Sequence, residues 1–181
     1  MTILLKPVFT EPERLDAALQ ADGRAVLSPG GLCELLDTAP LQLEALRPSW
    51  DDLPPDAYLR DGGRYRRRRH ACYIVDGTTV EPVAHRPHWQ PLEYNALHGG
   101  LERWFEPMQD AVVAQPVWTR LLQVLSEQCS RLKGAQPWYV EAHQFRIDTT
   151  DGIGRPTPEG AHRDGVDLVA VILIDRQNIK G

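Results

Sequence analysis

Hydrophobic positions recur at helical spacing in several parts of the chain. The clearest helix is predicted over residues 116–133, "PVWTRLLQVLSEQCSRLK", where apolar side chains recur every three or four positions between an opening proline and Gly134. Shorter patterns predict helices over residues 11–21 and 29–38, and "LERWFEPM" predicts the start of a helical region at 101–108. We expect the early helices to pack outside the core that follows.

Other segments show the alternation or continuous apolarity of strands. "RAVLS", residues 24–28, predicts a short strand, and residues 71–75 and 80–83 flank the turn "DGTT" as in a hairpin. Residues 138–148, "WYVEAHQFRID", alternate and are rich in aromatic and β-branched side chains. Residues 166–174 are apolar on both faces, which is typical of a buried strand. The order of elements indicates an α+β protein.

Composition narrows the class of protein. The 181 residues suffice for one domain with a sizeable core, and 42% hydrophobic with 25% charged residues is ordinary for a globular protein. A net charge of −5 gives no general attraction to nucleic acid or membrane, and no apolar run approaches the ~18 residues of a membrane span. Three widely spaced cysteines form neither a disulfide framework nor a zinc motif. We therefore expect a cytoplasmic protein with no nucleic-acid or membrane partner.

A basic run, "RYRRRRH", occupies Arg64 to His70 and contains five arginines. Guanidinium groups suit phosphate or carboxylate binding, so some of Arg64–Arg69 are candidates for a site. The alternative is a solvated strand edge, where charge discourages pairing between sheets. The sequence leaves the role of this run open.

The segment "AHRDG" carries His162 and Asp164 with one residue between them. In an extended segment, residues two apart point to the same side, so imidazole and carboxylate can meet one ion. A 2-His-1-carboxylate set binds Fe(II) and leaves open positions for a bidentate ligand and dioxygen. The alternative is a simple turn, in which Asp164 accepts a backbone hydrogen bond ahead of Gly165.

The surrounding residues resemble a known family. "VEAHQFRIDTTDGIGRPTPEGAHRDGVDLVAVILIDRQNIKG" is similar to the core of the Fe(II)- and 2-oxoglutarate-dependent dioxygenases. "PEGAHRDGVD", "IDRQNIKG" and the upstream "RYRRRR" resemble the bacterial family that includes free L-isoleucine hydroxylases and biofilm-stress proteins.

This resemblance implies a double-stranded β-helix (jelly-roll) core with N-terminal and flanking helices. Residues 1–181 would form one domain, with residues 1–60 as helical support and 64–181 as an incomplete jelly roll. His162 and Asp164 would be two iron ligands of a hydroxylase that consumes dioxygen and 2-oxoglutarate, with ascorbate as reductant. The substrate implied is a free L-amino acid or a similar small carboxylate.

The chain departs from the family pattern at its end. The resemblance calls for a distal histidine and a basic residue for 2-oxoglutarate, yet no His follows His162 and no Arg follows Arg176. We expect both, with the last strands, beyond Gly181, so that this fragment alone would be inactive. An internal third ligand (His85, His88, His98 or His143) is disfavoured, because a lone histidine is more often a core or rim residue. The alternative function is a non-enzymatic jelly-roll module for ligand binding or stress response.

The strand at 138–148 supplies further candidates for binding substrate or cosubstrate. Alternation places Glu141 and His143 on one face and Gln144 and Arg146 on the other. Arg146 suits a carboxylate, Glu141 an amino group and His143 a substrate carboxylate. Structural roles, an ion pair for Arg146 and a rim carboxylate for Glu141, are the alternatives.

Overall fold

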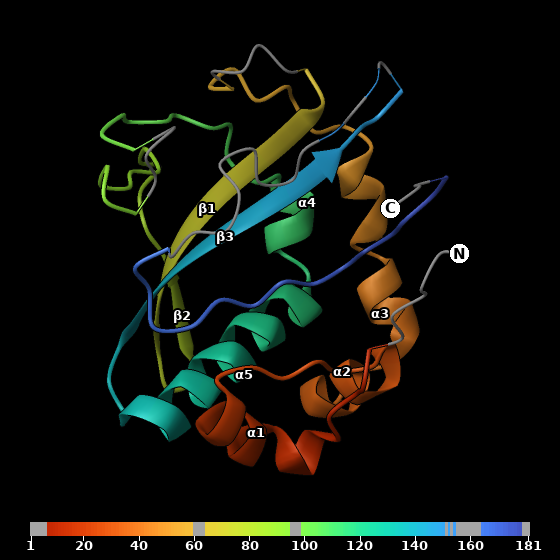
Figure 1. Cartoon of the computed structure of the whole chain (residues 1–181), viewed down its shortest axis with the longest axis vertical. Helices are drawn as coiled ribbons and strands as arrows, with labels where there is room; N and C mark the ends of the chain where they lie inside the picture. The colour runs from red at the N-terminus through yellow and green to blue at the C-terminus, as the bar shows by residue number, and fades with distance from the viewer. Residues whose placement is uncertain are drawn as a thin grey trace.

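A three-stranded antiparallel sheet forms the centre of the computed structural model, which describes residues 7–59, 64–94, 99–150, 152, 154 and 164–178. The strands are β1 (Arg66–Asp76), β2 (Thr79–Pro82) and β3 (Trp138–Ile147), in the order β2-β1-β3 (Figure 1). The predicted hairpin and the strand near residue 140 are therefore confirmed. β1 begins five residues earlier than the apolar alternation suggested, because it includes most of the basic run.

The helices lie mainly before the sheet and between β2 and β3. They are α1 (Leu15–Asp22), α2 (Pro29–Leu36), α3 (Pro40–Glu44), α4 (Asp110–Val113) and α5 (Pro116–Lys133), with 3-10 turns η1 (Pro12–Arg14) and η2 (Arg47–Trp50). The long predicted helix is confirmed as α5, which contacts all three strands, while α1 and α2 pack against α5 (Figure 1).

Alternation along the strands gives the sheet two different faces. Tyr73, Val75 and Trp138 point to the helix side and are buried, and Trp118 of α5 joins Tyr73 and Val75 in the hydrophobic core. The opposite face carries arginine, histidine, glutamate and aromatic side chains, and we call it the site face. The helices therefore cover one face of the sheet, and the other face carries the polar side chains.

The basic run lies on the central strand, so its interpretation as a solvated edge is wrong. β3 pairs with β1 along its length, from Arg66↔Ile147 to Val75↔Trp138. On the other edge, Arg68 N–H donates to Pro54 O at 3.0 Å and His70 N–H to Glu106 O at 3.0 Å, so loop segments take the place of a strand. Both backbone edges of this stretch are engaged, and alternate arginine side chains are buried.

Two other local predictions are wrong. Residues 24–28 form no strand, although Thr10 N–H donates to Val26 O at 2.7 Å, and Ser28 caps the helix that follows. Residues 101–108 are extended rather than helical, with isolated bridges His88↔Arg103 and His70↔Pro107. Burial alternates with a period of two from residue 102 to 106, as in a strand, so the apolar spacing there was misread.

The strand predicted over residues 166–174 is also absent. The described segment 164–178 has no assigned strand, and Val166, Val169, Val171 and Leu173 are 56–89% exposed. Within this described segment, Ile172 is the residue that packs against the core, and the ion pairs Lys133–Asp167 and Arg47–Asp175 link the segment to α5 and η2. An apolar strand needs hydrogen-bonding neighbours and two covered faces, and no described residue provides them.

None of the helices in the described part of the chain combines the length and apolarity needed to cross a bilayer.

Candidate functional site

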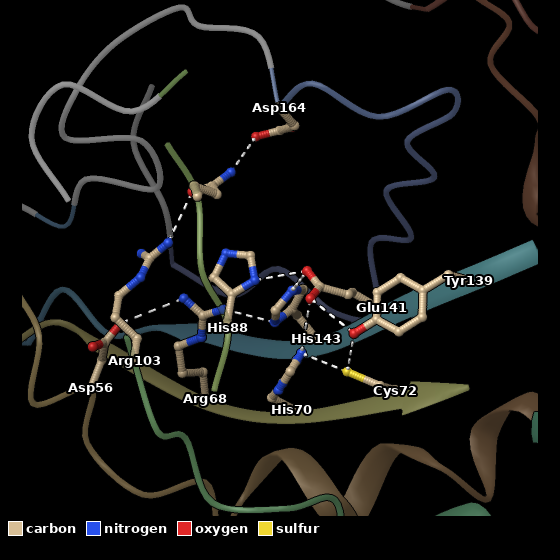
Figure 2. Close-up of polar contacts among 11 residues, drawn as sticks. Asp56, Arg68, His70, Cys72, His88, Arg103, Tyr139, Glu141, His143 and Asp164 are labelled. Atoms are coloured by element: carbon tan, nitrogen blue, oxygen red, sulfur yellow. Dashed lines mark hydrogen bonds and ion pairs between the residues drawn. The ribbon is translucent and has the colours of Figure 1, made fainter. Parts of the chain in front are cut away.

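Three histidines and a glutamate converge on the site face. His70 comes from the middle of β1, Glu141 and His143 from β3, and His88 from the segment after β2 (Figure 2). Their ligand atoms all lie within 4.8 Å of one another. We call these four residues the histidine–glutamate cluster.

Strand register and backbone bonds bring the cluster together. His70 faces His143 across the β1–β3 ladder, and Cys72 faces Glu141. The loop residue His88 is fixed because its N–H and C=O both bond to Arg103 at 3.0 Å. Positions on two rigid strands and a pinned loop preorganise the donors.

Glu141 is the centre of the polar contacts. His88 Nδ1 donates to Glu141 Oε2 at 2.7 Å, while His143 Nε2 lies 3.9 Å from Oε2 and His70 Nε2 lies 4.0 Å from Oε1. The Tyr139 hydroxyl lies 3.3 Å from Oε1 and 3.0 Å from Cys72 Sγ. Burial opposes ionisation of Glu141, but the hydrogen bond and charge of His88 outweigh it, so its pKa is lowered. The carboxylate is an anion at neutral pH.

Arg68 forms one wall beside the cluster. Its guanidinium lies 3.7 Å from the ring centroid of Phe105 and 4.3 Å from that of Phe145, and Nη2 donates to His143 Nδ1 at 2.7 Å. Because guanidinium only donates, His143 Nδ1 accepts and the neutral ring carries its proton on Nε2. Burial lowers the pKa of Arg68 to about 9, against the attraction of Asp56, so it stays charged at neutral pH.

Two of the histidines are held neutral. Burial lowers the pKa of His70 to about 4. Burial, followed by the charge of Arg68, sets the pKa of His143 well below its ordinary value. Neutral imidazole is the form that ligates metals, so the protonation state of the cluster suits a divalent ion.

Asp164 lies near this cluster but is not a member of it. Gln90 Nε2 donates to Asp164 Oδ1 at 3.3 Å, and Arg103 Nη2 donates to Gln90 Oε1 at 2.9 Å (Figure 2). Asp164 is exposed. Its predicted partner, His162, lies outside the described residues, so the iron pair stays a prediction.

The strand candidates separate between the two faces of the sheet. Glu141 and His143 lie in the cluster, as their shared face predicted. Gln144 is 1% exposed on the helix side and donates to Ser49 Oγ at 2.7 Å. Arg146 also points to that side, 3.6 Å from Asp148 and 4.0 Å from Asp51. The structure therefore does not bring Gln144 and Arg146 to the site face.

Sequence reasoning did not single out His70 as a site residue, and it offered Arg68 only as one member of the run Arg64–Arg69. A period-two pattern through "RYRRRRHAC" would have placed Arg66, Arg68 and His70 on one face. The run of identical charges hid that alternation, because both faces read as polar.

The donor set fits a non-haem metal centre. His70, His88 and Glu141 supply two imidazoles and one carboxylate, the combination that binds Fe(II) and related ions with positions left open. A helix-backed antiparallel sheet with such donors is compatible with a metal-binding protein of the non-haem type.

Comparison with known proteins gives the family. The profile of the 2OG-Fe dioxygenase family matches residues 47–181, and the chain belongs to that family. A bsmA homolog from Methylobium petroleophilum PM1 is 46% identical, with a TM-score of 0.81 over 88% of this chain and 65% of that one. IDO from Bacillus thuringiensis shares the fold at 15% identity, with a TM-score of 0.64 over 86% of this chain and 66% of that one. This chain thus spans slightly under two thirds of these structures, and no curated protein matched it.

Proposed function

We propose that the protein is an Fe(II)- and 2-oxoglutarate-dependent hydroxylase acting on a free L-amino acid or a similar small carboxylate. The observation that carries the proposal is the family match over residues 47–181, which contains both the HxD pair and the histidine–glutamate cluster. The cluster supports it independently, because imidazole and carboxylate donors of the kind that bind Fe(II) converge on one face of the sheet within the matched residues.

The proposal assigns iron to His162 and Asp164. It assigns the third histidine ligand, and the basic residue that binds 2-oxoglutarate, to parts of the protein beyond residue 181. The match covers 65% of the bsmA homolog, so that structure is longer than the part matched here. In the same proposal, the three strands belong to a jelly-roll core.

Iron with 2-oxoglutarate and dioxygen would supply the oxidation of a C–H bond. The residues of this chain bind and orient the substrate. Glu141 is ionised and its side chain is 28% exposed, so it can accept hydrogen bonds from a substrate amino group. Arg68 holds His143 in one tautomer, which fixes the Nε2–H donor toward the same space. Gln144 and Arg146 stay outside the proposal, because the helix side of the sheet holds them.

Succinate release tests the proposal. The protein at its natural length is supplied with Fe(II), ascorbate and 2-oxoglutarate, and each proteinogenic L-amino acid is added separately. The expected result is succinate that rises with one amino acid and disappears in His162→Ala. His85 lies outside the cluster, so His85→Ala serves as the matched control and should keep the activity.

Other outcomes change the proposal in defined ways. Bound metal without substrate-dependent succinate would exclude L-amino acids as the substrate class. The absence of both metal and succinate would favour a non-enzymatic binding module on the same scaffold.

A further inference from the structure

The histidine–glutamate cluster and Asp164 are two separate sets of metal donors. The four cluster residues have ligand atoms within 4.8 Å of one another, and Asp164 is not part of that group. Gln90 Nε2 donates to Asp164 at 3.3 Å, and Gln90 Oε1 accepts from Arg103, which is not a member of the cluster. A single ion bound by Asp164 therefore leaves the cluster donors uncommitted.

The spacing around Glu141 is close to that of a formed centre. A tetrahedral ion with bonds of about 2.0–2.2 Å sets neighbouring ligand atoms about 3.3 Å apart. The distances from Glu141 oxygens are 2.7 Å to His88 Nδ1 and 4.0 Å to His70 Nε2. The first distance is to Oε2 and the second to Oε1, and the ligand atoms of the whole cluster lie within 4.8 Å of one another. Binding one ion at the tetrahedral spacing therefore requires side-chain movements of up to about 1.5 Å.

Not every member of the cluster is equally suited to ligation. His143 accepts the Arg68 hydrogen bond at Nδ1, so its Nε2 carries a proton and has no lone pair to offer. His88 can ligate through Nδ1 only after losing the proton that it donates to Glu141, which metal binding would displace. His70 and Glu141 are less restricted, because His70 Nε2 contacts a weak partner, Cys72 Sγ, at 3.4 Å, and the carboxylate oxygens of Glu141 are acceptors.

The charge near the cluster is also compatible with a dication. Glu141 contributes one negative charge, and the nearest arginine, Arg68, lies 3.8 Å from the buried carboxylate of Asp56. Arg68 Nη2 points to His143, not to the three proposed ligands.

We propose that His70, His88 and Glu141 form a second divalent-metal site, separate from the iron pair, that takes an imidazole-preferring ion such as Zn²⁺ or Co²⁺. His143, held by Arg68, is a neighbour that positions Glu141. That this site is additional to an iron site rests on the proposed function, whereas metal binding by these three residues does not depend on it. Because Glu141 is also proposed to meet the substrate amino group, an ion bound here would compete with substrate.

Metal titration of the 181-residue chain tests the site. Metal-free protein carrying both His162→Ala and Asp164→Ala is titrated with Zn²⁺ by calorimetry and with Co²⁺ by visible absorption, which reports the coordination geometry of the ion. One site per chain is expected. Adding Glu141→Gln, of equal size, should weaken binding at least tenfold, whereas Glu106→Gln, an exposed control, should leave it unchanged.

The outcomes separate this inference from the proposed function. No binding to the double variant overturns the second site and leaves the iron pair untouched. Binding that survives Glu141→Gln also overturns it. If Glu141→Gln does not fold, as judged by circular dichroism, His88→Gln replaces it, and unchanged affinity in that variant overturns the site in the same way.

Discussion

Asp56 is the buried anion beneath the arginines of the site face. Its side chain is 0% exposed, and Oδ2 accepts from Arg66 Nε at 2.7 Å and lies 3.8 Å from Arg68 Nη1. Oδ1 accepts from Tyr58 N–H at 2.9 Å. The side chains of Arg66 and Arg68 are 6% and 3% exposed, so neither charge is compensated by water.

Replacing Asp56 by asparagine removes the charge and keeps the size. The amide oxygen can still accept from Tyr58, but the amide NH₂ faces a guanidinium donor, and two buried cations lose their anion. Removing one partner of a buried ion pair costs about 3–5 kcal/mol. We expect Asp56→Asn to lose that much free energy of unfolding, a large share of the 5–15 kcal/mol that is typical of a domain.

Urea unfolding followed by tryptophan fluorescence and far-UV circular dichroism measures this loss. The matched control is Asp51→Asn, because the Asp51 side chain is 87% exposed and 4.0 Å from Arg146. The control should change stability by less than about 0.5 kcal/mol. A loss under about 1 kcal/mol for Asp56→Asn, at an unchanged denaturant slope, would refute the view that Asp56 holds the arginines in place.

Three further predictions concern pH, packing and metal. The pKa of His70 falls from 6.5 to about 4 on folding, so the unfolded chain binds the extra proton between these values; stability should drop by at most about 3 kcal/mol as pH falls through this window, and His70→Gln should flatten the unfolding curves measured across it. Trp118 Nε1 donates to the buried Tyr73 hydroxyl at 3.0 Å, so Trp118→Phe should cost about 1–3 kcal/mol by urea unfolding; if pairing with Tyr73→Phe recovers none of that, the hydrogen bond is not the cause. In the protein at its natural length, Asp164→Ala should weaken Fe(II) or Mn(II) binding, measured by calorimetry, by orders of magnitude. Unchanged affinity would exclude Asp164 as a ligand.

The local sequence pattern predicted an element correctly where the residues of that element and its neighbour decide its structure. α5 follows from apolar residues at helical spacing between Pro116 and Gly134, and the β1–β2 hairpin follows from a turn between alternating segments. The alternation of β3 predicted that Glu141 and His143 share a face. In each case the deciding interactions lie within the segment or its immediate neighbour.

The sequence pattern gave the wrong prediction where the structure of a segment depends on residues far away in the chain. The segment 101–108 contains apolar residues that suit a helix, but its backbone pairs with residues 88 and 70. The segment 166–174 has the composition of a buried strand, yet composition cannot supply the neighbouring strands that such a segment needs. The sequence left the basic run open between a binding site and an exposed edge, because its burial depends on loops at residues 54–56 and 106–108.

The sequence alone determined the family resemblance, the HxD pair and the main elements, because these depend on residues close together in the chain. Only the tertiary structure decided which side chains meet. It brought His70, His88 and Glu141 together from three segments, and it placed Gln144 on the opposite face. A site of this kind depends on strand register and on pinned loops, and those are set by hydrogen bonds between residues far apart in the chain.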